Sequence, residues 1–405
     1  MRGSSAKGLE VSDSEVFGFS PARMGRVGLL LLLLFPTCEA PAENVGGDES
    51  GLAIEAILTL ETVGNVAGGV KRDSAFLGNF DLTATLDTEQ AAGLAGGTLF
   101  VYLLGNFGEA PSAFVGDTQG SSNIEAVEAF KLYEAWYDQL IFDEQLSVLV
   151  GLHDYNSEFY TLDYAGGLLN SSFGIGPDVA QVRPSIFPTT ALAARVKWKV
   201  LERGYLLGAL YDGVPGDPKN PRGTHIKFGS EEGLFYAVEA GVLGEEGRDY
   251  FKLALGFWYQ TTDFEDFAGR PQSNNHGVYL IGEKKLFSEE TEGEGLGVFL
   301  QIGLPRKSRN QIGHYLGTGL AHTGLVEGRG EDVLSFGMAH ARNSDAYRES
   351  TVGALRAETA IELNYRAVLT PQLTVTPDLQ WIIDPGTTAG VADAWVVGLR
   401  VELTF

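Results

Sequence analysis

Three basic residues occupy alternate positions in one short stretch of the sequence. Arg195, Lys197 and Lys199 are separated by apolar residues over 195–200. Successive side chains of a β-strand point to opposite faces, so a strand here would carry the three cations on one face. A charged side chain that faces lipid near the bilayer midplane costs about 2–4 kcal/mol. If the apolar face meets lipid, the basic face therefore lines a water-filled interior, where it can attract and orient polar solutes.

Carboxylates available to these cations occur in the stretch Asp154–Asp178. Asp154 and Glu158 could oppose the basic face across a narrow opening and create a transverse field. Alternatively, charges that line a wet interior only keep it hydrated and pair with their neighbours. The sequence leaves both interpretations open. It favours Arg195 as the cation nearest the opening, because Arg195 is the closest of the three to the segment 187–190.

The stretch Asp154–Asp178 is long for a connection between strands. It mixes amides, carboxylates and aromatic rings, namely Asn156, Glu158, Asp163, Asn170, Phe159, Tyr160 and Phe173. Long ordered loops often carry function, so we predict that this loop folds inward and narrows a pore. The alternative is a surface loop that packs on its neighbours through Asn and Gly turns.

Two of the five tryptophans share a register with charged residues. Trp136 is in step with Glu134 and Trp258 with Lys252, so both rings could face the interior and stack on a solute ring. The other tryptophans lie on apolar registers, where belts of Trp and Tyr mark membrane interfaces. These are Trp198, Trp381 and Trp395. Further basic candidates for the interior are Arg222, Arg342 and Arg366.

Enzymatic and metal-binding motifs are missing from the sequence. It contains no Walker A loop, G-x-S-x-G elbow, H-E-x-x-H or G-x-G-x-x-G. Asp154 and Glu158 could mimic the acid and nucleophile of a glycosidase, but an acidic chain offers such pairs by chance. His314 and His322 could share a strand face, but they have no neighbouring carboxylate or thiolate that would complete a metal site. We therefore expect neither catalysis nor a metal or other cofactor.

The composition disfavours two kinds of partner. The 405-residue chain is 44% hydrophobic and has a formal net charge of −24 at pH 7. Nucleic-acid binding needs a clustered basic surface, and docking onto an anionic surface is disfavoured by this charge. Apart from one short leucine run, no stretch of about 18 or more residues is apolar, so no membrane-spanning helix is predicted.

Apolar and polar residues alternate with period two over residues 361–405. Three segments, 361–370, 372–381 and 395–405, each place apolar and aromatic side chains on one face. A soluble sheet can alternate similarly, but these segments are long and their apolar face is almost unbroken. The pattern is typical of a transmembrane barrel, with strands that are apolar toward lipid and polar toward the lumen.

The same alternation recurs from Leu52 onward without a break in composition. Examples are 80–87, 146–153, 195–200 and 252–259, with a helical turn suggested at 88–92. At roughly 22 residues per strand and connection, the chain predicts about 16 antiparallel strands in one closed all-β barrel. Short periplasmic turns and longer extracellular loops would connect them. Closure leaves no unpaired strand edge, as lipid requires.

The beginning of the chain resembles a secretory leader. Arg23 and Arg26 precede an apolar run at 27–35, and Ala40–Ala42 forms an A-x-A cleavage site. We assign residues 24–42 to a signal peptide and 43–405 to a single barrel domain. Residues 1–23 play no part in such a leader, and we interpret them as a start-site overcall. The single cysteine, Cys38, falls within the leader and follows a poor lipobox.

Several motifs resemble one known family. They are Asp154–Phe159, Leu169–Asp178, Pro184–Leu192, Asp212–Asp217, Asn274–Gly277, Ala339–Asn343 and Thr376–Gln380. With these motifs in the same order, the chain resembles the carbohydrate-selective porin (OprB) family. The resemblance extends from about Leu52 to Phe405. The resemblance implies a 16-stranded barrel in a Gram-negative outer membrane that lets sugars diffuse down their gradient. Family members often carry an arginine where this chain has Leu149, which leaves the selectivity undecided.

The resemblance also implies partners and a solute path. Sugars would be the solutes and outer-membrane lipid the surroundings. Phe405 resembles the residue by which the barrel assembly machinery recognises such chains, and a homotrimer is compatible with the sequence. The expected path is lined by Asp154, Asn156, Glu158, Asn170, Arg195, Lys197, Arg222, Arg342, Trp136 and Trp258. An exported, soluble, β-rich carbohydrate-binding protein is the alternative, but it leaves the apolar register unexplained.

Overall fold

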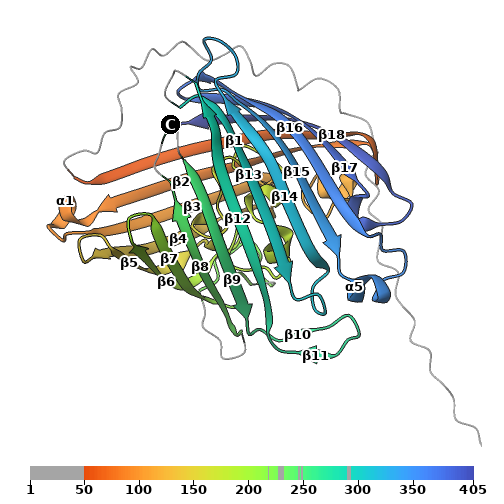
Figure 1. The fold of residues 1–405 in the computed structure, drawn as a ribbon, viewed down its shortest axis with the longest axis horizontal. Coiled ribbons are helices and arrows are strands. Elements are labelled where there is room, and N and C mark those ends of the chain that lie inside the picture. The colour runs from red at the N-terminus through yellow and green to blue at the C-terminus, as the bar shows by residue number, and fades with distance from the viewer. Residues whose placement is uncertain (1–49, 218, 227–231, 245–246, 248–249, 290–292) are drawn as a thin grey trace, which may run out of the picture. The chain divides into compact units, whose positions relative to one another are not determined.

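The computed structural model describes residues 50–405 except 218, 227–231, 245–246, 248–249 and 290–292. The predicted overcall 1–23 and signal peptide 24–42 lie outside the described residues. Sixteen antiparallel strands form one closed barrel, in which β1 pairs with both β2 and β18 (Figure 1). The predicted fold class is therefore confirmed.

The barrel strands differ in length around the wall. They are β1 (Leu52–Gly69), β2 (Asp73–Asp87), β3 (Gly97–Gly108), β4 (Ala129–Ile141), β5 (Leu146–His153), β6 (Ala191–Val200), β7 (Gly204–Asp212), β8 (Leu234–Leu243), β9 (Phe251–Gln260), β12 (Asn275–Ser288), β13 (Gly295–Pro305), β14 (Ile312–Thr323), β15 (Val333–Asn343), β16 (Ala357–Thr370), β17 (Leu373–Ile383) and β18 (Ala392–Thr404). Between β9 and β12, β10 (Phe264–Glu265) and β11 (Pro271–Gln272) form a separate small hairpin.

The helices are short. They are α1 (Thr88–Ala92), α2 (Ser112–Val115), η1 (Tyr155–Ser157), α3 (Ser171–Gly174), α4 (Pro177–Ala180), α5 (Asp345–Ser350) and η2 (Pro385–Thr387). The predicted turn at 88–92 is α1, and Asp87 caps it by accepting hydrogen bonds from the next turn's backbone N–H groups. Within the described part of the chain, none of the helices has the length and apolar character needed to cross a membrane.

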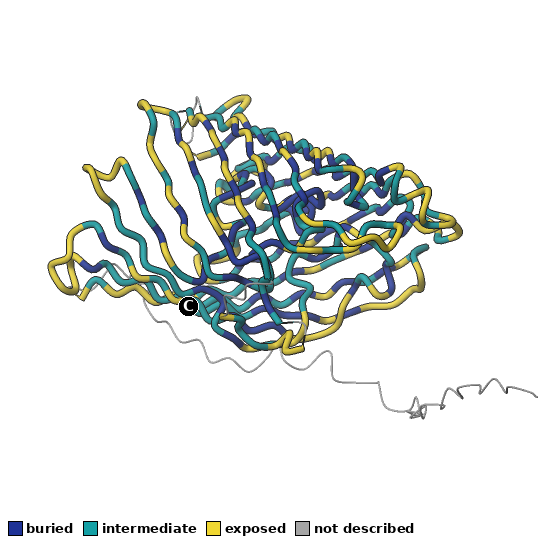
Figure 2. Tube along the Cα trace, turned by 90° about the horizontal axis from the view of Figure 1, so that it is seen from below, coloured by how far each residue is buried: buried dark blue, intermediate teal, exposed yellow. Residues whose placement is uncertain are grey.

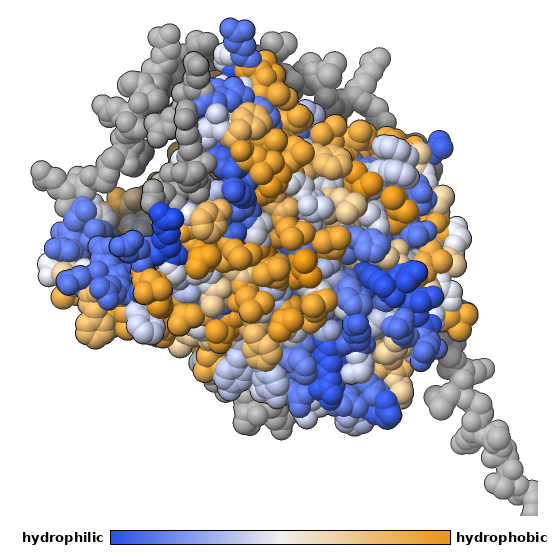
Figure 3. Space-filling view, viewed as in Figure 1, coloured by the Kyte–Doolittle hydropathy of each residue, from blue (hydrophilic) through white to orange (hydrophobic). Residues whose placement is uncertain are grey.

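Exposed and buried residues alternate along the strands (Figure 2). On β18, Trp395, Val397 and Leu399 are 40–47% exposed, whereas Val396 and Arg400 between and beyond them are buried. Figure 3 shows apolar side chains gathered over the middle of the visible strands, with hydrophilic ones toward the strand ends. The apolar register therefore forms the outer wall, as the alternation predicted.

Two loops bond to the inward register of the wall. We refer to them as the 109–128 loop, between β3 and β4, and the 154–190 loop, between β5 and β6. Glu358 on β16 accepts hydrogen bonds from the backbone N–H groups of Thr118 and Gln119 at 2.8 and 2.9 Å. The loops also bond to each other, since Asn123 N donates to the carbonyl of Leu169 at 2.8 Å.

The 154–190 loop crosses the barrel and is held from many strands. Glu239 on β8 accepts a hydrogen bond from Tyr160 N at 3.1 Å, and Glu283 on β12 accepts one from Tyr164 N at 2.9 Å. Glu362 on β16 accepts hydrogen bonds from the backbone N–H groups of Leu169 and Asn170 at 2.6 and 2.9 Å. Carboxylates of the wall thus satisfy loop N–H groups that would otherwise be buried without partners. Lys252, Gln301, Tyr315 and Asn364 donate to loop carbonyls.

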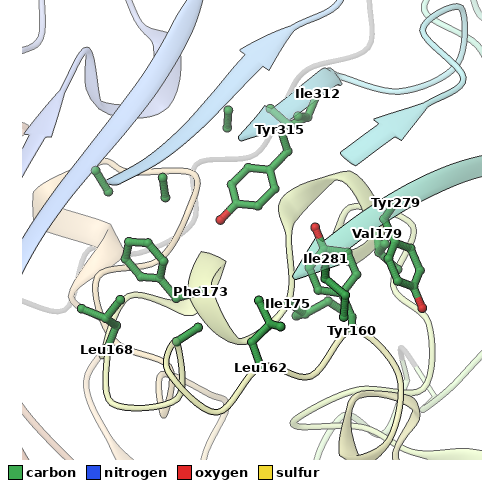
Figure 4. Packing of buried hydrophobic residues seen from close by; sticks show 14 of the residues in the cluster. Tyr160, Leu162, Leu168, Phe173, Ile175, Val179, Tyr279, Ile281, Ile312 and Tyr315 are labelled. Atoms are coloured by element: carbon green, nitrogen blue, oxygen red, sulfur yellow. The ribbon is translucent and has the colours of Figure 1, made fainter. Parts of the chain in front are cut away.

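Much of the apolar core lies between the 154–190 loop and strands β7–β15, and the rest extends to the 109–128 loop and to β1, β2 and β16–β18. Figure 4 shows Tyr160, Phe173 and Ile175 of the loop beside Tyr279 of β12 and Tyr315 of β14. Small residues on the wall make this packing fit. A Cβ added at Gly337 would stand 2.5 Å from the Phe173 ring, and one at Gly303 would stand 2.0 Å from the Asp178 carboxyl. These inward glycines therefore provide room for the loop.

Candidate functional site

The predicted cluster forms where β5 passes into the 154–190 loop. Asp154 follows the last residue of β5 and caps η1, because its side chain accepts a hydrogen bond from Asn156 N at 2.7 Å. The other Asp154 oxygen accepts one from the Tyr133 hydroxyl on β4. Burial raises the pKa of Asp154 to about 6, although these two hydrogen bonds oppose the shift.

Arg195 and Glu158 form a direct ion pair within this cluster. Arg195 Nε lies 2.6 Å from Glu158 Oε2, and its Nη1 lies 3.7 Å from Asp138 Oδ1. Arg195 is only 4% exposed. Lys197 Nζ lies 3.7 Å from the other Glu158 oxygen, and this side chain is 44% exposed. The cations therefore contact Glu158 directly and do not oppose it across an open gap, which corrects the predicted arrangement. The inward direction predicted for the basic face is observed.

Two cavities adjoin the cluster, and a third is lined by a later part of the same loop. The first, of about 680 Å³, lies between the two loops and strands β1–β3 and β18, and its lining includes Asp81, Tyr102, Asn156 and Arg400. The second, of about 730 Å³, is lined by Ser157, Glu158, Lys197 and residues of β7–β9. The third, of about 380 Å³, adjoins Phe187 and the loop after β7. In η1, Asn156 therefore faces the first cavity and Ser157 faces the second.

Two of the predicted residues serve as anchors. Asn170 is completely buried and caps α3, and its Nδ2 donates to Gln380 on β17 at 3.1 Å. Trp258 faces inward as predicted, but it is completely buried and stacks on Phe235 with ring centroids 6.2 Å apart. The 154–190 loop covers this part of the wall, so neither side chain lines a cavity in the structure.

Trp136 faces inward, which is the direction that the sequence predicted. It is partly exposed on the inward register of β4, and it stacks on Phe100 of β3 with centroids 4.8 Å apart. Its ring lies edge-on to His153 at 6.4 Å. His153 also contacts Ser157 and Glu158, so Trp136 borders the Asp154 cluster.

Two arginines do not join the cluster. Arg222 belongs to the loop after β7, its side chain is 68% exposed, and it lies 3.8 Å from Glu128. Arg342 shares the register of the exposed Phe336, opposite to the buried Ala339 and Ala341, so it faces outward at the end of β15. The expectation that Arg342 lines the interior is therefore wrong. The inward register of β15 consists of small residues such as Gly337, Ala339 and Ala341, because the loops pack against it.

Sequence reasoning missed the residues that hold the loops and Arg400, which lines the cavity of about 680 Å³. Glu358 and Glu362 stand on the polar register of β16, and this register was the available signal for them. Arg400 donates to Glu61 on β1 and, at 2.7 Å, to Asn123 of the 109–128 loop. Such long-range bonds leave no local mark on the sequence. Among the described residues, no group of three or more His, Cys, Asp or Glu could hold a metal ion.

Comparison with known proteins agrees with this geometry. Residues 71–405 match the model of the carbohydrate-selective porin, OprB family. Porin B of Pseudomonas aeruginosa is 23% identical over 322 residues, which is 69% of each chain. The putative porin QuiX of Acinetobacter baylyi is 22% identical over 418 residues, covering 88% of this chain and 90% of that one. A high-pH structure of Pseudomonas putida OprB superposes with a TM-score of 0.80 at 21% identity, covering 88% of this chain and 95% of that one.

The family match spans most of the chain and the barrel is closed. This excludes the exported soluble binding protein and indicates a channel of the Gram-negative outer membrane. The family and fold point to a channel and away from an enzyme. The chain belongs to the carbohydrate-selective porin, OprB family, and is an outer-membrane porin.

Proposed function

We propose that this porin lets mono- or oligosaccharides diffuse passively into the periplasm, without energy coupling or a cofactor. The observation that carries the proposal is the cavity of about 680 Å³ beside β1–β3 and β18. Its lining combines hydroxyl, amide, carboxylate and guanidinium groups, including Thr59, Asn79, Glu402 and Arg400. These groups can replace the hydration of a sugar's hydroxyls, while Tyr102 offers a ring for its apolar face.

The 154–190 and 109–128 loops would narrow the path. Both loops bond to the inward register. The 109–128 loop bonds to Glu61 on β1 through Ser122, and the 154–190 loop bonds to Gln380 on β17 through Asn170. Asn156 faces the first cavity and Glu158 the second, so we assign the narrowest point to η1. Arg195 would hold Glu158 in place there, and the exposed Lys197 would meet the solute. Asp154 would act indirectly by capping η1.

The polar lining also suits transport, because a channel must bind its solute weakly. Many of the polar groups nearest η1 already have protein partners, such as Asp154 with Tyr133 and Glu158 with Arg195. A solute would form hydrogen bonds with water and with the remaining polar groups. Because many groups near η1 already have a partner, the solute would bind weakly. Several weak contacts along the path allow entrance and release.

Planar-bilayer conductance with added solutes tests the proposal. We expect glucose or a disaccharide to block the current in a concentration-dependent way. A polyethylene glycol of similar size serves as the control, because it fills the same volume without a sugar's hydroxyl pattern. A channel that responds equally to the polymer and to every sugar would contradict sugar selectivity and leave the pore itself intact.

A further inference from the structure

Inward-facing aromatic residues fall into two groups within the described part of the chain. On β7–β14 the rings are at most 8% exposed and pack against the 154–190 loop. These are Tyr205, Tyr211, Phe235, Trp258, Tyr279, Phe299 and Tyr315. In contrast, Phe100, Tyr102 and Trp136 on β3–β4 and Phe187 of the loop remain partly exposed. Core packing explains the first group but not the exposed surface of the second.

Together with Tyr133, a buried ring of β4, the second group forms a continuous row, which we call the aromatic ladder and define as Phe187, Tyr133, Tyr102, Phe100 and Trp136. In this order, consecutive ring centroids lie 6.4, 4.9, 6.4 and 4.8 Å apart. Because β3 and β4 are antiparallel, the order from Tyr133 to Trp136 follows the strands from the end with long loops to the end with short turns. The ladder therefore runs along the expected direction of transport.

The ladder begins at a junction between two cavities. Phe187 lines both the cavity of about 380 Å³ on the long-loop side and the cavity of about 680 Å³ in the barrel. Tyr102 also lines the larger cavity. A solute that moves from the cavity of about 380 Å³ to the cavity of about 680 Å³ therefore passes Phe187 and then reaches Tyr102.

Polar anchors fix the orientation of the two tyrosines. The hydroxyl of Tyr102 donates to Asp81, and that of Tyr133 donates to Asp154. Asp81 also accepts from Asn79, so its position is held from a second side. Rings held in this way lose little conformational freedom when a ligand stacks on them. Beside them, the carboxylates and amides of the larger cavity can bond hydroxyl groups.

We propose that the aromatic ladder is a binding track for linear oligosaccharides of pyranose sugars, which rest the C–H faces of successive units on successive rings. This inference rests on the proposed function and specifies its substrate class. A monosaccharide contacts one or two rings at a time, whereas a trisaccharide contacts several. Affinity should therefore grow with chain length, because each added unit contributes another ring contact.

Current block by glucose, maltose and maltotriose measures this dependence in planar bilayers. In the unmodified porin the apparent affinity should rise from glucose to maltotriose. Replacing two rings, in Phe100→Leu with Trp136→Leu, should weaken maltotriose block by about thirtyfold, which corresponds to about 2 kcal/mol for the two ring contacts together. Glucose block should change by no more than about twofold, and conductance in salt alone should remain similar.

Aromatic residues on the outer face of the same strands give matched controls. Phe107 on β3 and Phe130 on β4 are 39% and 67% exposed and stand on the outward register. Phe107→Leu and Phe130→Leu should leave both affinities unchanged. Tyr102→Leu is an independent second variant in case the double variant does not assemble, and it should also weaken maltotriose block.

The outcomes separate this inference from the function on which it rests. Sugar block that does not grow with chain length, or that the ring variants leave unchanged, overturns the ladder while the sugar channel stands. Loss of affinity in the outward controls overturns it as well. Absence of block by every sugar in the unmodified porin refutes the proposed function and the ladder together.

Discussion

The Arg195–Glu158 contact concentrates the electrostatics of the proposed constriction in one buried pair. Arg195 is 4% exposed and lies 2.6 Å from Glu158, which also lies 3.7 Å from Lys197. Two cations thus share one carboxylate. Because burial weakens the screening of charges by solvent, the Arg195–Glu158 pair holds η1 in position more strongly than the exposed Lys197–Glu158 pair does.

Arg195→Ala should loosen η1 and weaken sugar block, and it should make the channel more cation-selective. Breaking a buried pair by removing one partner costs about 3–5 kcal/mol, since the other charge stays buried. Reversal potentials in a salt gradient, together with sugar titrations, measure both effects. Lys197→Ala is the control for an exposed pair worth about 1 kcal/mol or less, and it should have a smaller effect on block. Equal effects of the two variants would contradict the special role of Arg195.

Asp178 makes the 154–190 loop sensitive to pH. It lies in α4, where burial raises its pKa to about 7, and the hydrogen bond from the Tyr160 hydroxyl opposes the shift. A carboxyl with a raised folded-state pKa binds its proton more tightly when folded. Its stabilising contribution is therefore complete below the ordinary value of 3.8 and is lost as the pH rises to about 7.

We therefore expect protection of the backbone amides around α4 to fall between about pH 4 and pH 7. Hydrogen exchange, corrected for the intrinsic pH dependence of the exchange reaction, measures this protection. Asp178→Asn is neutral at every pH and should remove most of the change. An identical pH profile in the variant would assign the effect to other groups facing the loop.

The two loops depend on the wall strands through backbone hydrogen bonds to carboxylates. Glu362 on β16 holds the N–H groups of Leu169 and Asn170, and Glu358 on the same strand holds those of Thr118 and Gln119. Since one strand anchors both loops, β16 links the two elements that we propose narrow the lumen.

Glu362→Ala should free the middle of the 154–190 loop and raise channel conductance. A buried N–H without a partner costs about 1–3 kcal/mol, so exchange of the Leu169 and Asn170 amides should accelerate by about tenfold or more. Exchange mass spectrometry of peptides covering α3 measures the change. Glu402→Ala is the control, because Glu402 lines the cavity of about 680 Å³ on β18. Faster exchange in the control but not in Glu362→Ala would contradict the anchoring role.

The strands could be predicted from the sequence, but the contacts inside the barrel could not. Alternation over 361–405 located β16, β17 and β18, because lipid and water impose period two on every strand. Trp258 was placed on the correct face, but nothing local shows that the 154–190 loop covers it. Gly303 illustrates the same limit, because its lack of a side chain makes room for Asp178 from a distant part of the chain. Packing between distant segments decides which inward residues stay accessible.

The stability of the whole barrel in the membrane depends on contact between its outward-facing side chains and the hydrocarbon of the lipid. Leu255 stands in the middle of β9 and is 59% exposed, and Val242 stands near the turn end of β8 and is 43% exposed. Leu255→Arg should cost about 2–4 kcal/mol in lipid, whereas Val242→Arg should cost about 1 kcal/mol or less because it lies near the interface. Folding into lipid vesicles, followed by gel mobility without boiling, measures the folded fraction. Equal losses at the two positions would contradict this membrane placement.

The cavity of about 680 Å³ lies beside β1–β3 and β18, and the polar positions of these strands that line it are distinct from the apolar positions that pack against the loops. On β1 and β2, for example, Thr59 and Asn79 line the cavity, whereas Val63 and Leu77 belong to the apolar core. Substitutions that retune what passes and substitutions that weaken the fold therefore fall at different positions of the same strands. A designer could randomise the cavity-lining positions and retain a barrel that still assembles, so this protein offers a scaffold for channels with new solute preferences.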